Sequence, residues 1–152
     1  MSTALALTLL FFFPHLSRDQ AQTYSKVIIA ESVFRDVDPL ITTSRIWAES
    51  GFRWKAVEPK QGNYGLMMVS QKVFDPAKNI RLGVRALAYW QQWHKEGKCS
   101  QKPPHFSWAH YTWGYRVPLR HRTLKQRKMT TVYRKLKRRM QRYAKTTRPD
   151  QS

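Results

Sequence analysis

Apolar residues recur at helical spacing along much of this chain, and capping residues divide the pattern into segments. Ser17 is a good N-cap for one such segment, which runs to the first of two Asp-Pro pairs. Each pair, Asp38-Pro39 and Asp75-Pro76, favours a new helix, because proline is tolerated at the first helical position. The first of these helices should end at Gly51, and the second should run to about Lys95.

The stretches between these helices are less regular. Residues 52–64 read as a loop rich in turn residues, and 65–70 (GLMMVS) predict a short helical turn. Residues 96–104 form a polar loop, and 106–114 predict a further short helix. No period-two pattern typical of a strand stands out. The pattern therefore predicts a mainly α fold.

The two ends differ in character. Residues 1–16 contain the run ALALTLLFFF, which is shorter than the ~20 apolar residues that span a bilayer. The run has the length of a signal-peptide core, although no Lys or Arg precedes it, so two alternatives stay open: a signal or targeting segment, or a buried N-terminal helix. Residues 129–144 predict a basic helix with one apolar stripe. The stripe consists of Tyr133, Leu136, Met140 and Tyr143.

Composition supports one globular domain: the chain has 152 residues, 41% of them apolar and 24% charged. The formal net charge is +19, and the stretch from Arg116 to Arg148 holds fourteen Lys or Arg and no Asp or Glu. Such a balance implies an anionic partner, namely nucleic acid, an acidic membrane surface or an anionic envelope polymer. With Cys99 as the single cysteine, no internal disulfide is possible, and we predict neither a metal site nor a cofactor.

Four motifs follow one another between Asp36 and Val117. They are AESGF (48–52), GLMMVS (65–70), DPAKNIRLGVRALAYW (75–90) and AHYTWGYRV (109–117). In order and spacing they resemble the motifs of the soluble lytic transglycosylase family, roughly ESGF, GLMQ, DP-x-x-NI-x-LG and YNAG. The resemblance implies a lysozyme-like single domain, here followed by a C-terminal basic helix.

The resemblance also implies roles for individual residues. Glu49 matches the catalytic acid, and Tyr111 matches a tyrosine that hydrogen-bonds the catalytic carboxyl group. A substrate-binding role is implied for Ser50, Gly65, Leu66, Met67, Met68 and Tyr111. The residues Asn79, Ile80, Leu82 and Gly83 match a helix that packs behind the cleft.

Two departures from the family pattern affect the cleft. Met68 replaces a glutamine, which removes an amide that can bind sugar. Residues 111–114 read YTWG in place of YNAG, which adds the bulk of Trp113.

The implied activity is cleavage of the β-1,4 bond between N-acetylmuramic acid and N-acetylglucosamine in peptidoglycan, with formation of a 1,6-anhydro ring. Most glycosidases need two carboxylates, whereas this family uses one. An acid that is protonated near neutral pH should have its pKa raised by an apolar setting, which Ile46, Trp47 and Phe52 could supply. Glu58 and Asp75 are the alternative carboxylates for a water-using mechanism.

The sequence thus predicts an apolar segment at 1–16, a catalytic domain at 17–118 and a basic extension at 119–152. The partner would be peptidoglycan glycan strands, with the basic helix contacting an anionic membrane or lipopolysaccharide. The expected location is the bacterial periplasm or envelope, or a phage virion as a lysis or entry enzyme. Two other functions remain open: a goose-type lysozyme-like hydrolase, and a non-catalytic nucleic-acid-binding or virion structural protein on the same fold.

Overall fold

The computed structural model describes residues 1–98, Tyr111 and 119–146, and over this part of the chain the protein is mainly α. The helices are α1 (Ser2–Phe12), α2 (Arg18–Phe34), α3 (Pro39–Ser50), α4 (Pro76–Lys95) and α6 (Leu119–Thr146). Two short antiparallel strands, β1 (Val57–Glu58) and β2 (Asn63–Tyr64), form a hairpin between α3 and α4. The prediction of a mainly α fold is therefore confirmed.

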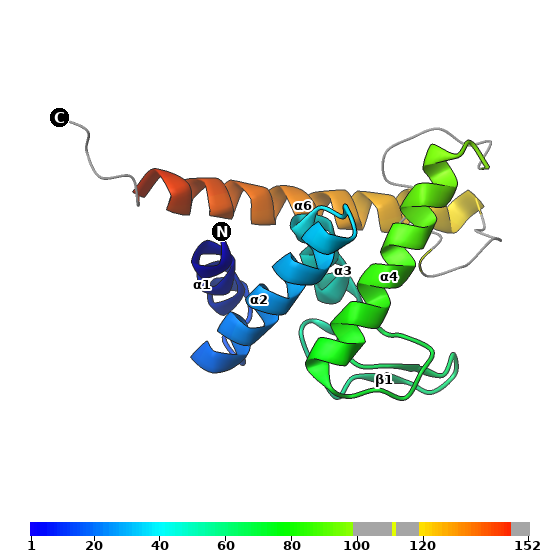
Figure 1. Ribbon diagram of the computed structural model, residues 1–152, viewed down its shortest axis with the longest axis horizontal. Coiled ribbons are helices and arrows are strands. Elements are labelled where there is room, and N and C mark those ends of the chain that lie inside the picture. The colour runs from blue at the N-terminus through cyan, green and yellow to red at the C-terminus, as the bar shows by residue number, and fades with distance from the viewer. Residues whose placement is uncertain (99–110, 112–118, 147–152) are drawn as a thin grey trace.

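The helices pack around α2 and α3. Helix α2 contacts α1, α3 and α4, while α6 contacts α3 and α1. In Figure 1 the long α6 runs across the molecule, α1 and α3 lie against it, and α4 crosses at the end opposite α1 with the β hairpin near its start. The two ends of the described chain are therefore part of the same packed body as the helices between them.

The three helix starts predicted from sequence are confirmed, and each has a physical cap. The Ser17 hydroxyl accepts from the Gln20 backbone N–H at 3.1 Å, while the Gln20 side chain accepts from the Ser17 N–H. The carboxylates of Asp38 and Asp75 cap α3 and α4 by accepting backbone N–H groups at 2.8 and 2.7 Å. A left-handed Gly51, at φ 58°, ends α3.

Some local predictions were wrong. GLMMVS is a non-helical turn, closed by an isolated bridge between Tyr64 and Val69, because its backbone pairs with the hairpin and with a side chain of α4. The hairpin strands are two residues long and so leave no period-two pattern. The basic helix begins at Leu119 instead of Met129. Except for Tyr111, which is helical, the helix predicted at 106–114 lies outside the described residues.

The N-terminal apolar segment forms α1 and contributes to the core. Leu5, Leu9, Phe13 and Leu16 are all buried against the rest of the molecule. This packing corresponds to the buried-helix alternative. No helix in the described part of the chain combines the length and the apolarity needed to cross a membrane.

The apolar stripe of α6 is also occupied. Leu136 is fully buried, and Met140 lies within 3.5 Å of the Thr8 hydroxyl of α1. The Tyr133 hydroxyl donates to the Asp38 carboxylate at 2.7 Å. The stripe therefore packs on α1 and α3, while most of the described cations of α6 are exposed. The contact of the basic helix with an anionic membrane or lipopolysaccharide stays a prediction.

Candidate active site

Helix α3 presents Arg45 and Glu49 one turn apart, near its C-terminal end. Positions i and i+4 share a helix face, and the Arg45 guanidinium forms an ion pair with the Glu49 carboxylate. The Arg45 side chain is 1% exposed and that of Glu49 is 15% exposed. A buried cation thus lies directly beside the proposed catalytic acid.

The loop opposite Glu49 is held in place by Asn79 of α4, which is fully buried. The Asn79 side-chain oxygen accepts from the Met67 N–H at 2.8 Å, and its NH₂ group donates to the carbonyls of Tyr64 and Val73 at 2.9 and 2.8 Å. One amide thereby satisfies three backbone groups of a turn that has no regular secondary structure of its own.

Two glycines allow this turn to approach α4 closely. A Cβ on Gly83 would lie 2.6 Å from the Cβ of Met67. Gly65 has φ +78°, and a Cβ there would lie 2.9 Å from the Val73 carbonyl oxygen. The GLM turn and the NI-x-LG segment of α4 therefore pack directly on each other. Gly83 of α4 leaves room for Met67 of the turn, and Gly65 of the turn leaves room for Asn79 of α4.

Tyr111 lies on the other side of Arg45. Its ring faces the guanidinium, with 4.4 Å from the Arg45 Cζ to the ring centroid, and its hydroxyl donates to the Met67 carbonyl at 2.8 Å. The expected hydrogen bond to the catalytic carboxyl is thus replaced by one to the GLM turn. Burial raises the pKa of Tyr111, the Arg45 charge lowers it and the Glu49 charge raises it.

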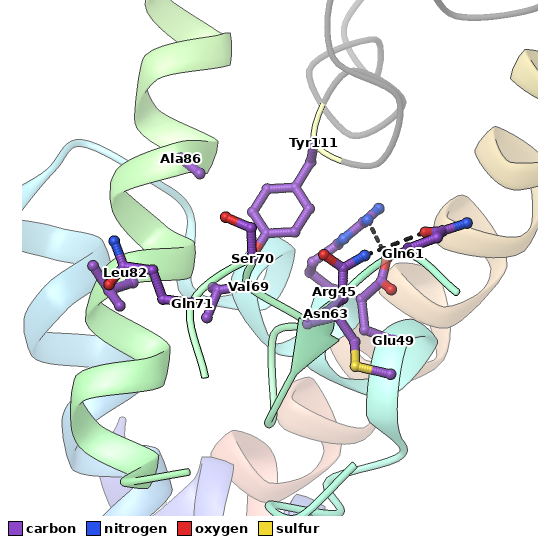
Figure 2. A pocket seen from close by; sticks show the side chains of 11 residues that line it. Arg45, Glu49, Gln61, Asn63, Val69, Ser70, Gln71, Leu82, Ala86 and Tyr111 are labelled. Atoms are coloured by element: carbon purple, nitrogen blue, oxygen red, sulfur yellow. Dashed lines mark hydrogen bonds and ion pairs between the residues drawn. The ribbon is translucent and has the colours of Figure 1, made fainter. Parts of the chain in front are cut away.

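Arg45, Glu49 and Tyr111 line one pocket of about 280 Å³ (Figure 2). Figure 2 shows Glu49 and Arg45 pointing toward each other, with Tyr111 beside them. Burial lowers the pKa of the Arg45 guanidinium, and the neighbouring Glu49 opposes that shift. The lining residues are Arg45, Glu49, Gln61, Asn63, Met68, Val69, Ser70, Gln71, Leu82, Ala86 and Tyr111.

Among the described residues that line the pocket, Glu49 carries the single carboxylate. The undescribed stretches 99–110 and 112–118 contain no Asp or Glu in their sequence. Asp75 caps α4 and Glu58 lies on β1, so neither alternative acid is a lining residue. Glu31 begins the similar sequence ESVF. Its carboxylate forms an ion pair with Arg81 at 2.8 Å and does not line the pocket.

The predicted site residues divide into two groups. Glu49, Met68 and Tyr111 line the pocket. Ser50, Gly65, Leu66 and Met67 are buried instead and are not among the residues that line it. The Ser50 hydroxyl donates to the Ile46 carbonyl at 3.2 Å, so it bonds its own helix. The substrate contacts implied for these four residues stay a prediction, and what the structure shows for them is burial beside the pocket.

The residues expected to surround Glu49 with apolar side chains, Trp47 and Phe52, do not line the pocket. Trp47 and Phe52 pack in an aromatic cluster, with ring centroids 4.9 and 4.6 Å from that of Phe13. Successive helix residues point about 100° apart, so Trp47 lies on another face of α3 than Glu49. The apolar lining of the pocket is supplied by Met68, Val69, Leu82 and Ala86.

Sequence reasoning missed Arg45 and the polar groups of the hairpin and the following loop. Arg45 could have been found from its i, i+4 spacing to Glu49. Gln61, Asn63, Ser70 and Gln71 reach the pocket only through the fold of the loop, for which the sequence carries no local signal. Their amides and hydroxyl are suited to hydrogen-bonding a sugar.

Comparisons of the chain with protein-family models, curated proteins and solved structures found no match. Among the described residues, no group of three His, Cys, Asp or Glu side chains could hold a metal ion.

Proposed function

We propose that this protein is a peptidoglycan lytic transglycosylase, with Glu49 as the general acid and base. The substrate would be the glycan strands of the bacterial cell wall, cleaved between N-acetylmuramic acid and N-acetylglucosamine. The proposed site of action is the bacterial envelope, reached from the periplasm or from a phage particle.

The observation that carries this proposal is the convergence of four separated motifs on one pocket. Glu49 comes from the first motif, Met68 from the second, Leu82 from the third and Tyr111 from the fourth, and all four line it. Segments that pack merely for stability have no need to bring an acid, amides and an aromatic ring to one concave surface.

The chemistry needs one carboxyl group. Glu49 donates a proton to the glycosidic oxygen as the bond from that oxygen to C1 of muramic acid breaks. The Glu49 carboxylate then takes the proton of the C6 hydroxyl group, and the oxygen of that hydroxyl group bonds to C1. The ring closes, no water is consumed, and Glu49 is protonated again for the next turnover. A pocket with one lining carboxylate suits this route better than hydrolysis by a carboxylate pair.

The ion pair between Arg45 and Glu49 has to open during this cycle. A proton and the guanidinium compete for the same carboxylate, so the ion pair has to open before Glu49 can donate to the substrate. A free carboxylate of the peptide attached to the muramic acid residue would draw Arg45 away, because a guanidinium binds carboxylates in bidentate geometry. Arg45 would then bind substrate as well as hold the resting acid.

Two alternatives make different use of the same surfaces. A goose-type hydrolase would add water to the bond. A non-catalytic nucleic-acid-binding or virion protein would depend on the cations of α6, such as Arg134, Lys135 and Arg138, which are exposed. Salt-sensitive DNA binding without wall lysis would favour that alternative.

The test is loss of turbidity of purified cell walls with wild type and Glu49→Gln. We expect Glu49→Gln to be slower by roughly 10²- to 10⁴-fold, the usual contribution of general acid–base catalysis. The matched control is Glu58→Gln, which makes the same chemical change on the nearby β hairpin and should retain wild-type activity. Thermal unfolding of each variant separates a loss of chemistry from a loss of fold. Equal activity of Glu49→Gln and wild type would remove Glu49 from the mechanism.

A further inference from the structure

Helix α1 exposes apolar side chains on the face opposite its core contacts. Leu5 and Leu9 are buried, whereas Leu7 is 42% exposed, Phe11 57% and Met1 69%. We call Leu7, Phe11 and Met1 the α1 ridge. A helix that is apolar on all sides is normally covered on all sides, so this face indicates a contact outside the described fold.

Two grooves flank the ridge, and Leu7 lines both. The groove between α1 and α2 has a volume of about 490 Å³ and includes Arg18 and Lys26 among its lining residues. The groove between α1, α3 and α6 has a volume of about 620 Å³ and includes Lys137. These three cations are exposed. The ridge is thus apolar along its crest and cationic on both sides.

Arg139 adds a fourth cation at the edge of the ridge. Its guanidinium carbon lies 3.9 Å from the centroid of the Phe11 ring and 4.8 Å from that of Tyr143. Among the described lining residues of the two grooves there is no carboxylate. The acids nearest to Arg18 and Lys26 in the sequence are Asp19 and Glu31, and Glu31 pairs with Arg81 of α4.

We propose that the α1 ridge docks on the surface of an anionic lipid bilayer. Helix α1 would lie along the plane of the interface, with Leu7 and Phe11 at the boundary between headgroups and acyl chains. Arg18, Lys26 and Lys137 would contact lipid phosphates. An apolar crest between two cationic flanks is the pattern of an interfacial helix, and both halves of that pattern match a lipid surface.

This surface differs from the one predicted from sequence. The apolar stripe of α6 packs on α1 and α3, with Leu136 fully buried and Met140 and Tyr143 lining the second groove. The exposed apolar contact therefore comes mainly from α1, and α6 contributes mainly cations. Figure 1 shows α1 at one edge of the molecule, at the end opposite α4 and the β hairpin. Docking through α1 is independent of the proposed catalytic function, which concerns the pocket between α3 and α4.

The experiment is co-sedimentation of the full chain with phosphatidylglycerol vesicles and with phosphatidylcholine vesicles. We expect binding to phosphatidylglycerol alone. The variant Leu7→Ser/Phe11→Ser should bind about tenfold more weakly, because it removes the apolar contact and leaves every charge. The control variant Val33→Ser/Phe34→Ser changes two residues at the C-terminal end of α2 that are 61% and 79% exposed, and it should bind like wild type.

A second arm changes charge and leaves the ridge intact. Lys26→Glu/Lys137→Glu should weaken vesicle binding at low salt, while added salt should weaken wild type and the Leu7→Ser/Phe11→Ser variant alike. Equal vesicle binding by the ridge variant and wild type would overturn the proposal, since attraction by charge alone would then explain it. The proposal would also be overturned if wild type formed a dimer and the Leu7→Ser/Phe11→Ser variant were a monomer that still bound vesicles like wild type.

Discussion

At the scale of single residues, the pocket depends on the contact between Gly83 of α4 and Met67 of the GLM turn. The three hydrogen bonds of Asn79 hold that turn, and the missing side chain of Gly83 makes room for it. Because of this contact, replacing Gly83 with alanine should lower the free energy of unfolding, whereas Gly→Ala in a helix usually raises it.

In an exposed helix interior, Gly→Ala stabilises by about 1 kcal/mol. Gly83→Ala should instead destabilise the protein by about 1–3 kcal/mol, because the new methyl group would overlap Met67. The double variant Gly83→Ala/Met67→Ala should lose less free energy than the two single changes summed, since the second change removes the overlap with Sδ and Cε of Met67, at 2.4 and 2.8 Å, and leaves the contact with its Cβ. Urea unfolding measures all three. A stabilised Gly83→Ala would show that the turn is not packed on α4 in this way.

At this scale the motifs identified residues of the pocket and of its support. They did not indicate which contact each side chain makes. Glu49, Asn79 and Gly83 were all selected from the motifs. The side chains of Ser50, Leu66 and Met67 are buried beside the pocket, and a motif alone does not distinguish a side chain that lines a pocket from one that supports it. Tyr111 was expected to bond Glu49, yet a hydroxyl has one proton, and the Met67 carbonyl accepts it.

At the scale of elements, Asp38 joins α3 to α6. One carboxylate oxygen caps α3 through the Leu40 N–H, and the other accepts from the Tyr133 hydroxyl at 2.7 Å. The cap could be predicted, because Asp-Pro is a local signal. The second bond could not, because it joins residues 95 positions apart and depends on how α6 packs.

Asp38→Ala should therefore cost more stability than Asp75→Ala. Both changes remove an N-cap followed by proline, worth ~1 kcal/mol. Asp38→Ala also removes the partner of Tyr133, which adds roughly 1 kcal/mol or more. Asp75 is the matched control, since its side chain caps α4 by accepting from the Lys78 N–H. Equal unfolding free energies for the two variants would mean that α6 does not rely on Asp38.

The same contact predicts a dependence on pH. Burial and the hydrogen bond to Asp38 raise the pKa of Tyr133 from 10.0 to about 12. Because the folded value exceeds the unfolded one, this contribution to stability is complete below pH 10 and is lost as the pH rises through about 12. The stability difference between wild type and Tyr133→Phe should therefore shrink across this range. Unfolding free energies at stepped pH would measure it, and a constant difference would contradict the bond.

At the scale of the whole molecule, residues 1–16 and α6 pack on the other described helices. The apolar run at 1–16 could not be assigned from sequence, because a signal-peptide core and a buried helix have the same composition, and only the partners that cover Leu5, Leu9 and Phe13 distinguish them. For the same reason the stripe of α6 looked like a membrane face. The mainly α fold, by contrast, was predictable, since it follows from caps and periodicity within each segment.

The proposed function depends on a pocket to which the described part of the chain contributes one carboxylate, that of Glu49. A lone acid suits ring closure by the sugar's own hydroxyl, whereas hydrolysis normally requires a second carboxylate. The products of the two reactions differ by one water for each bond cleaved.

Mass spectrometry of the fragments released from purified cell walls tests this most directly. The account predicts fragments that end in 1,6-anhydro-N-acetylmuramic acid and their absence from digests with Glu49→Gln. Fragments that carry the additional water at their ends, or anhydro fragments formed equally by Glu49→Gln, would contradict it.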